Sequence, residues 1–254
     1  MRDDDFGVPC PGSEAPPELW TRPHLERLPT RGPLLWNELF GRSAPIVVDL
    51  GCGNGRYLIS SAIARPGWDH LGVDTVPVVI RHAVQRARRR GLSNLKFAVA
   101  DAREVVGRLL PAGSVRELHV YHPQPYYDLA YVHRRLFTAE FMAGVAQALE
   151  PEGLLVVQTD NPGYWDYLNQ LLPLFVAWEE HSEPWPDAPQ GRTRREILAR
   201  SAGLKIYRGQ GQRRRDLDLR QALAAAAALP PPVFSADRRL RRLDAAESAN
   251  VRRP

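Results

Sequence analysis

Cysteine, lysine and long apolar runs are all scarce in this chain of 254 residues. The two cysteines, Cys10 and Cys52, are too few for a disulfide scaffold or for a zinc site built on several thiolates, and we expect no metal. No run reaches about 18 apolar residues, so the sequence predicts no membrane-spanning helix and no membrane partner. The acidic start at residues 1–5 lacks the apolar core of a secretory signal, and we expect a cytoplasmic protein.

The positive charge is concentrated at one end of the chain. The net charge is +5, and residues 212–254 hold ten arginines and five acids, which leaves 24 basic and 24 acidic residues elsewhere. The sequence therefore predicts a neutral domain with a basic tail, not a protein that is basic over its whole surface.

Composition divides the chain into three parts. Residues 1–40 are rich in proline and predict an irregular arm, with a short helix around residues 34–40. Residues 41–211 alternate between apolar runs and helical patterns, which predicts one folded domain. Residues 212–254 contain an alanine run and a triple proline, followed by an arginine-rich stretch, and we expect a basic tail of low order.

The alternation of strands and helices in the domain predicts an α/β fold. Short β-branched runs ending at turn residues favour buried strands, and the segments between them have helical periodicity. Such alternation is typical of a mostly parallel sheet with helices on both faces. The predicted strands are 46–50, 70–74, 95–99, 115–122, 154–158, 175–180 and 204–208, and the predicted helices are 56–65, 76–90, 138–149, 162–172 and 193–202.

A glycine cluster between the first strand and its helix is the sharpest local signal. Gly51, Gly53 and Gly55 permit a tight turn and let a ligand approach the backbone closely. Asp74 ends the second strand, 19 residues after Gly55, where a carboxylate can accept hydrogen bonds from ribose hydroxyls. The loop is therefore a candidate site for a nucleoside-containing cofactor.

Two cofactor classes use such a carboxylate. A nicotinamide fold needs G-x-G-x-x-G, whereas this loop reads G-x-G-x-G, with Arg56 at the site of the third glycine. Asp49 precedes the loop and would repel pyrophosphate but attract the ammonium of S-adenosylmethionine, and Asp101 can accept from an adenine amino group. Three acids at successive strand ends favour S-adenosylmethionine; capping a helix is the alternative role of each.

Several further motifs carry a resemblance to a known family. Residues 91–95 (GLSNL), Pro123-x-Pro125, residues 134–136 (RRL), residues 159–161 (TDN) and Thr193-x-x-Glu196 follow the glycine loop in order. In this order and near-spacing, from about residue 46 to 208, the chain resembles the bacterial tRNA (guanine-N7)-methyltransferases.

The resemblance implies a fold, a reaction and a set of site residues. The fold would be a Rossmann-like S-adenosylmethionine-dependent methyltransferase domain, with a seven-stranded, mostly parallel sheet and an antiparallel end. The reaction would form N7-methylguanine in the variable loop of tRNA, with tRNA as partner and a monomer or homodimer as the acting form. The cofactor site would comprise Asp49, Gly51, Gly53, Gly55, Asp74 and Asp101, and the substrate site Asp160, Thr193 and Glu196.

One segment departs from the family pattern. Gln124 takes the place of the family's active-site aspartate, and Asp128 stands where a substrate-contacting lysine is usual. Tyrosines surround both positions, and such rings can stack an unpaired base or simply form an aromatic loop over the sheet edge. Arg134 is a candidate phosphate contact and, alternatively, part of the solvated first turn of the next helix.

The chemistry of guanine N7 limits the effect of Gln124. N7 carries no proton and has an exposed lone pair, so its methylation needs orientation and water exclusion but no general base. An amide at position 124 can still bind a base edge. Two alternatives remain open: a methyltransferase that acts on another RNA or on a small aromatic substrate, and a non-catalytic RNA-binding relative that still binds the cofactor.

Overall fold

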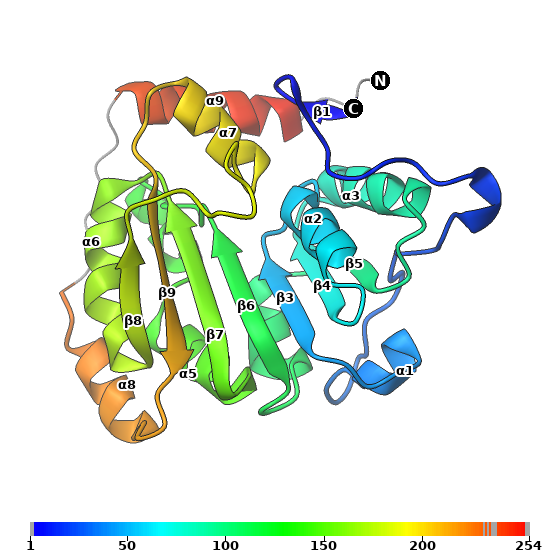
Figure 1. The fold of residues 1–254 in the computed structure, drawn as a ribbon. Coiled ribbons are helices and arrows are strands. Elements are labelled where there is room, and N and C mark those ends of the chain that lie inside the picture. Colours follow the sequence, from blue (N-terminus) through cyan, green and yellow to red (C-terminus); the bar gives the residue numbers. More distant parts are fainter. Residues whose placement is uncertain (1–2, 231, 233, 235–237, 252–254) are drawn as a thin grey trace.

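A seven-stranded sheet forms the centre of the computed structural model, which describes residues 3–230, 232, 234 and 238–251 (Figure 1). The described strands lie in the order β5-β4-β3-β6-β7-β9-β8. The strands β3 to β7 pair in parallel, and β9 is antiparallel to both of its neighbours, which confirms the predicted sheet. Their bounds are β3 (Ile46–Leu50), β4 (Asp69–Asp74), β5 (Leu95–Val99), β6 (Val115–Tyr121), β7 (Leu149–Thr159), β8 (Val176–His181) and β9 (Tyr207–Arg213).

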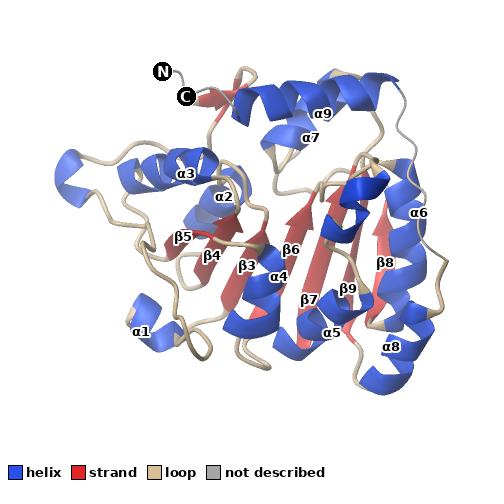
Figure 2. Cartoon of the chain, turned by 180° about the vertical axis from the view of Figure 1, so that it is seen from behind, coloured by secondary structure: helices blue, strands red, loops and turns tan. Residues whose placement is uncertain are grey.

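Helices cover the two faces of the sheet (Figures 1 and 2). The helices α2 (Arg56–Ala64) and α3 (Pro77–Arg89) pack on one face around Phe97, and α5 (Ala139–Ala148) and α6 (Pro162–Leu171) pack on the other. All five residues of β3 are buried, as expected for a β-branched central strand covered on both sides. Shorter helices of the domain are α4 (Ala102–Glu104), α7 (Arg194–Ser201), η2 (Val105–Leu109), η3 (Leu129–Arg134) and η4 (Leu172–Leu174).

The N-terminal arm covers the β5 edge of the sheet. The Phe97 amide donates to Pro23 O at 2.7 Å, and the Leu25 amide donates to Phe97 O at 2.8 Å, so the arm satisfies edge groups that would otherwise be open. The predicted short helix is present as α1 (Trp36–Phe40). The arm also contains β1 (Asp4–Asp5), β2 (Val8–Pro9) and η1 (Pro17–Leu19).

The C-terminal region is more ordered than the sequence suggested, which corrects the expected low-order tail. Within residues 212–254 the structure has α8 (Leu219–Ala227) and α9 (Arg238–Val251). Ala222 and Ala226 of α8 are buried in the core, because small side chains let the helix approach α5 closely. Leu240 and Leu243 of α9 are buried too. The division of the chain at residues 40 and 211 stays a prediction.

The last strand also lies later in the chain than predicted, at Tyr207–Arg213 instead of residues 204–208. Gly209 and Gly211 weaken its strand pattern, but a Cβ at Gly209 would meet the Trp178 ring of β8 at 2.4 Å. Glycine is therefore required there by packing across the strand pair. None of the described helices is both long and apolar enough to cross a membrane.

Candidate cofactor and acceptor site

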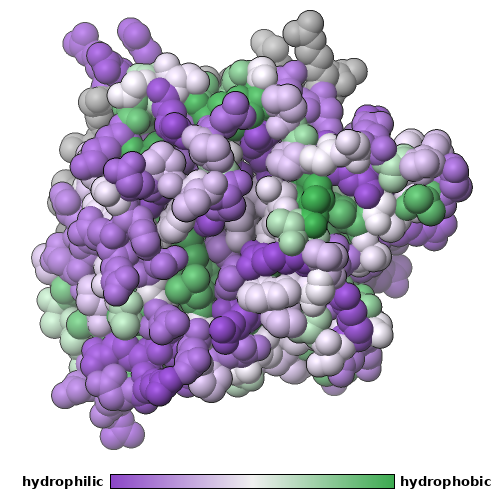
Figure 3. All heavy atoms as spheres, viewed as in Figure 1, coloured by the Kyte–Doolittle hydropathy of each residue, from purple (hydrophilic) through white to green (hydrophobic). Residues whose placement is uncertain are grey.

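A cavity of about 1300 Å³ opens at the carboxyl ends of the central parallel strands. Figure 3 shows this face as largely hydrophilic and hollowed between the part that carries α7 and α9 and the part that carries α2 and α3. Ligand cavities of about 300–1,000 Å³ are usual, so this one has room for a nucleoside cofactor and an acceptor base together. The predicted residues on its wall are Asp49, Gly51, Gly53, Asp74, Asp101, Gln124, Arg134 and Thr193.

The glycine loop leaves open space on its cavity side. Gly51 and Gly53 have φ angles of +81° and +53°, and a Cβ at either would meet nothing within 4 Å. Gly55 differs, because a Cβ there would lie 2.7 Å from the Phe97 ring. Gly55 allows α2 to pack on β5 and is not among the residues of the cavity wall, and its contact with a cofactor stays a prediction.

Asp74 holds the glycine loop against the end of β4. Its Oδ2 accepts from the Gly53 amide at 3.0 Å, and its Oδ1 accepts from the Val76 amide at 2.9 Å. Burial raises the pKa of Asp74, and these backbone hydrogen bonds oppose that rise. Each carboxylate oxygen keeps a second lone pair, so the group can still accept from a ligand.

Asp49 is the most unusual group in the cavity wall. Its side chain is only 1% exposed, and its Oδ1 has no hydrogen-bond partner among the described residues. Burial, followed by the charge of Asp74, raises the pKa of Asp49 well above its ordinary value. A buried carboxylate without a partner is unfavourable, so a cation placed beside it would be bound.

Asp101 combines the two roles that the sequence left open. It lines the cavity and also caps α4, accepting from the Arg103 amide at 2.7 Å. Burial acts to raise the pKa of Asp101, but the hydrogen bonds and charge of Arg103 outweigh it, and the net shift is downward. Its carboxylate is therefore ionised and partly exposed at the rim.

The segment that carries Gln124 is held in an unusual backbone conformation. His122 and Tyr126 flank it with φ angles of 51° and 45°, in the left-handed region that non-glycine residues rarely adopt. Gln124 itself is exposed on the cavity wall. Arg135 fixes the far end of the segment, donating to Pro125 O at 2.7 Å and to Tyr126 O at 3.1 Å. Its third carbonyl partner is Pro232 O, at 2.7 Å.

The other predicted residues of this segment lie at the surface. Arg134 is exposed on the cavity wall, with its guanidinium 5.0 Å from the centre of the Tyr131 ring. Asp128 caps η3 by accepting from the Ala130 amide at 2.9 Å, and it does not line the cavity. Arg134 is therefore exposed for a phosphate contact, whereas three of the five N–H donors of Arg135 already bind backbone carbonyls.

Two predicted substrate residues lie behind the cavity wall instead of on it. Asp160 pairs with Arg195 at 2.7 Å and lies 3.4 Å from His122 Nδ1. Burial acts to raise the pKa of Asp160, but His122 and Arg195 outweigh it and hold that pKa below its ordinary value. Glu196 is fully buried, and its carboxylate accepts from Arg208 at 2.6 Å.

Thr193 and Glu196 form the start of α7. The Thr193 hydroxyl accepts from the Glu196 amide at 3.0 Å, and the Glu196 carboxylate accepts from the Arg192 amide at 2.8 Å. Gln158 links this pair to residues 122–126 around Gln124, the acceptor segment, because its Nε2 lies 3.1 Å from Glu196 Oε2 and 2.9 Å from His122 Nε2. Asp160 and Glu196 thus support His122 from behind the cavity wall, and substrate contact by either stays a prediction.

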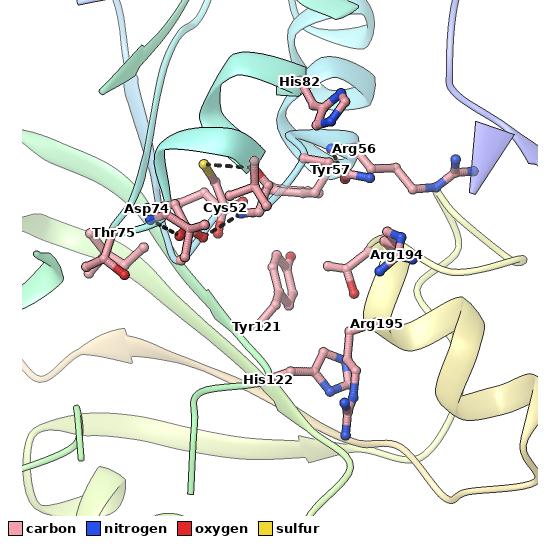
Figure 4. Close-up of a pocket in the computed structure, with 18 of the residues that line it drawn as sticks. Cys52, Arg56, Tyr57, Asp74, Thr75, His82, Tyr121, His122, Arg194 and Arg195 are labelled. Carbon is pink, nitrogen blue, oxygen red and sulfur yellow. Dashed lines mark hydrogen bonds between the residues drawn. The ribbon is translucent and has the colours of Figure 1, made fainter. Parts of the chain in front are cut away.

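Sequence reasoning missed a buried polar cluster under the cavity. The Tyr121 hydroxyl accepts from Arg192 at 3.0 Å and lies 2.9 Å from His119 Nδ1, whose Nε2 is 2.9 Å from the Tyr57 hydroxyl. Burial lowers the pKa of His119 to about 4, so the ring is neutral at pH 7. Figure 4 shows Tyr121 between the glycine loop and the side chains of α7. The one sequence signal for this cluster is the i, i+2 spacing of His119 and Tyr121, which places both side chains on the same face of β6.

Arg56 occupies the third-glycine position for a structural reason. Its guanidinium is buried, pairs with Asp5 at 3.2 Å, and donates to Pro9 O at 2.8 Å and to Gly191 O at 3.4 Å. It therefore fastens the N-terminal hairpin, which forms part of the cavity wall, to the loop before α7. Among the described residues there is no group of three or more histidine, cysteine or acidic side chains suited to a metal ion.

Sequence comparison finds close similarity to one group of enzymes. Residues 43–208 match the model of a family described as "Putative methyltransferase". The tRNA (guanine-N(7)-)-methyltransferase of Halorhodospira halophila is 31% identical over 193 residues, covering 74% of this chain and 83% of the relative. That of Rubrobacter xylanophilus is 32% identical, covering 72% and 82%. The Arthrobacter sp. enzyme is 42% identical, but the match spans only about half of its length, 48%.

Solved structures show the same fold at lower sequence identity. The 16S rRNA methyltransferase KamB aligns with a TM-score of 0.54 at 18% identity, covering 74% of this chain and 96% of that one. A mutant 16S rRNA (adenine(1408)-N(1))-methyltransferase from Catenulisporales acidiphilia, solved with its cosubstrate, aligns with a TM-score of 0.50 at 20% identity, covering 72% and 92%. At such identities the likeness establishes the fold alone.

Proposed function

The chain belongs to the tRNA (guanine-N7)-methyltransferase family, and from this premise we propose that it methylates N7 of a guanine in tRNA, using S-adenosylmethionine. The observation that carries the proposal is the buried carboxylate of Asp49, whose Oδ1 has no hydrogen-bond partner among the described residues, in the wall of a cavity large enough for both reactants. A nicotinamide dinucleotide would bring a pyrophosphate to this loop, where Asp49 disfavours an anion.

The residues of the cavity fit the cofactor. When bound, S-adenosylmethionine supplies an electrophilic methyl group on a sulfonium. Asp49 would pair with its ammonium and gain the partner that it lacks, and Asp74 would accept from ribose hydroxyls through its free lone pairs. The bare backbone of Gly51 and Gly53 lets the ligand approach without steric hindrance.

Gln124 has the chemistry to hold the acceptor base. Its amide can donate and accept at once, which suits the adjacent O6 acceptor and N1–H donor of guanine. Because N7 needs no deprotonation, the segment contributes by orienting the base and excluding water. His122, fixed by Gln158 and Asp160, and Arg135, fixed on Pro125 O, hold this segment from its two ends.

Thr193 is the member of the predicted substrate set that lies on the cavity wall. Its oxygen accepts from the helix backbone, so its hydroxyl proton is left to donate to a ligand. Arg134 is exposed on the same wall, and we propose that it contacts an RNA phosphate. We also propose a cytoplasmic location, where tRNA is modified, with a monomer or homodimer as the acting form.

Transfer of labelled methyl from S-adenosylmethionine to an unmodified tRNA transcript tests this function, followed by mass spectrometry of the nucleosides. We expect N7-methylguanine in the parent and, at a cofactor concentration near the parent's KM, a strong decrease of it in Asp49→Asn. The tyrosines around Gln124 favour one other candidate, methylation of a different RNA base, so an rRNA fragment is assayed in parallel. A methylated base other than N7-methylguanine, or cofactor binding with no transfer to either RNA, would refute the proposal.

A further inference from the structure

The outer face of α9 carries four arginines. Arg238, Arg239, Arg241 and Arg242 are all exposed, and no ion pair joins any of them to another described residue. They belong to the part of the chain that holds the whole charge excess, since the remainder is balanced. This helix lies beyond residue 208, where the match to the family ends. Its electropositive face therefore lies outside the residues that match the family model.

The inner face of α9 is fixed to the site. Leu243 packs with Ala199 of α7 and with Ile206, and Leu240 is buried as well. Asp244 accepts from Arg195 Nη2 at 2.8 Å, and the same Arg195 pairs with Asp160 behind the acceptor segment. Figures 1 and 2 show α9 lying above α7, across the end of the sheet where the cavity opens. The arginine face is thus held in a defined position relative to the cavity.

We propose that this arginine face of α9 is a docking surface for the phosphate backbone of the acceptor RNA, alongside Arg134 on the cavity wall. This inference rests on the proposed function. Guanidinium groups match phosphate oxygens in a bidentate geometry, and contacts to phosphate position an RNA without reading its sequence. In the segment beside Gln124, Asp128 and tyrosines leave Arg134 as the exposed arginine on the cavity wall, and α9 adds four more cations at the same end of the sheet.

A polyanion fits this face better than a membrane surface. A helix that binds a bilayer inserts an apolar face, but the buried leucines of α9 already pack on α7 and residue 206. What remains exposed from residue 238 to 242 is charge alone. The partner chemistry is therefore an array of phosphates, and RNA is the phosphate polymer that the neighbouring cavity would accept.

A matched pair of charge reversals tests the surface. The test variant is Arg238→Glu with Arg242→Glu, one turn apart on α9. The control is Arg31→Glu with Arg220→Glu, which makes the same change in net charge at exposed positions just before α1 and on α8, at the opposite end of the sheet (Figure 1). Binding of an unmodified tRNA transcript is measured by fluorescence anisotropy over a series of salt concentrations. Calorimetry with S-adenosylhomocysteine and thermal melting check that each variant is folded.

We expect the α9 variant to bind tRNA at least tenfold more weakly than the parent, and the control to stay within about twofold. The slope of log affinity against log salt should fall by roughly 1.4–1.8 in the α9 variant, because each lost phosphate contact contributes about 0.7–0.9. The apparent KM for tRNA should rise with kcat at saturating tRNA unchanged. Equal weakening in both variants, or unchanged binding in the α9 variant, would overturn the inference.

Two further arms separate the possible failures. If the α9 variant loses binding to phosphatidylserine vesicles while it keeps tRNA affinity, the face serves a membrane and the inference is overturned. Nucleoside analysis of tRNA treated with the parent tests the reaction independently. Absence of N7-methylguanine there would refute the proposed function, whereas the comparison of α9 and control variants would still decide whether this face binds RNA.

Discussion

Replacement of Asp49 by asparagine should weaken cofactor binding without destabilising the cofactor-free protein. The amide keeps the shape of the side chain but removes the charge that an ammonium would pair with. A hydrogen bond to a charged group contributes roughly 1.5–3 kcal/mol, so the affinity for S-adenosylhomocysteine should fall by about 10- to 150-fold. The matched control is Asp166→Asn, on the exposed face of α6, which should bind like the parent.

The pH dependence gives a second, independent signature of Asp49. Its pKa in the cofactor-free protein is raised by burial, so below that raised pKa the carboxyl is neutral and a cation must displace its proton. Affinity should therefore be full above the raised pKa and fall by up to tenfold per pH unit below it. In Asp49→Asn this dependence should disappear. Calorimetry across pH measures both profiles.

Stability should respond to pH with the opposite sign. Because the folded-state pKa of Asp49 lies above its unfolded value of about 3.9, its contribution to stability is present below that unfolded pKa and is lost as pH rises through the folded pKa. Asp49→Asn removes this loss, so the cofactor-free variant should melt at or above the parent temperature near neutral pH. Parent-like cofactor affinity in Asp49→Asn, or a lower melting temperature in its cofactor-free form, would refute the reasoning.

Three other substitutions probe the remaining parts of the site. Asp74→Ala should weaken S-adenosylhomocysteine binding by roughly 1.5–3 kcal/mol in calorimetry, because it removes an acceptor and also releases the Gly53 amide. Gln124→Asp should raise methyl transfer to tRNA at least tenfold if a carboxylate stabilises the transition state by about 2–4 kcal/mol; a decrease would mean that glutamine suits the actual acceptor. Arg135→Ala should destabilise the fold by roughly 2–3 kcal/mol and lower kcat, because its carbonyl partners, Pro125 O among them, lose their donor. Arg135→Lys should recover only part of the stability and part of kcat. Thermal melting measures the first and transfer kinetics the second.

The sheet and the glycine loop could be predicted because their signals are local. A buried parallel strand is a short apolar run, and the turn after it needs glycines whatever the rest of the chain does, so residues 46–50 and 70–74 were placed almost to the residue. The strand at Tyr207–Arg213 was misplaced because its glycines are selected by the Trp178 ring on a neighbouring strand. Local propensity contains no information about such a contact.

The absence of long-range information in local sequence also explains which site residues could be placed from the sequence. Asp49 and Asp74 follow the strand pattern, and the structure places both on the cavity wall. The sequence predicts Asp160 and Glu196 at the substrate site but not their ion pairs, which each makes with an arginine of α7 or β9. The role of Arg192 follows only once its loop has folded over the Tyr121 hydroxyl. Ion pairs and hydrogen bonds between residues far apart in the sequence cannot be predicted from motif spacing or composition.

The backbone at His122 and Tyr126 shows a conflict between stability and function. A left-handed conformation costs a non-glycine residue roughly 1–2 kcal/mol, and glycine would adopt it without that penalty. Glycine at position 122 would nevertheless remove the ring that binds Gln158 and faces Asp160, so the chain keeps the strain together with contacts that glycine cannot make. Attempts to stabilise this enzyme should therefore leave positions 122 and 126 unaltered. Relieving the backbone strain there would also loosen the segment that positions Gln124.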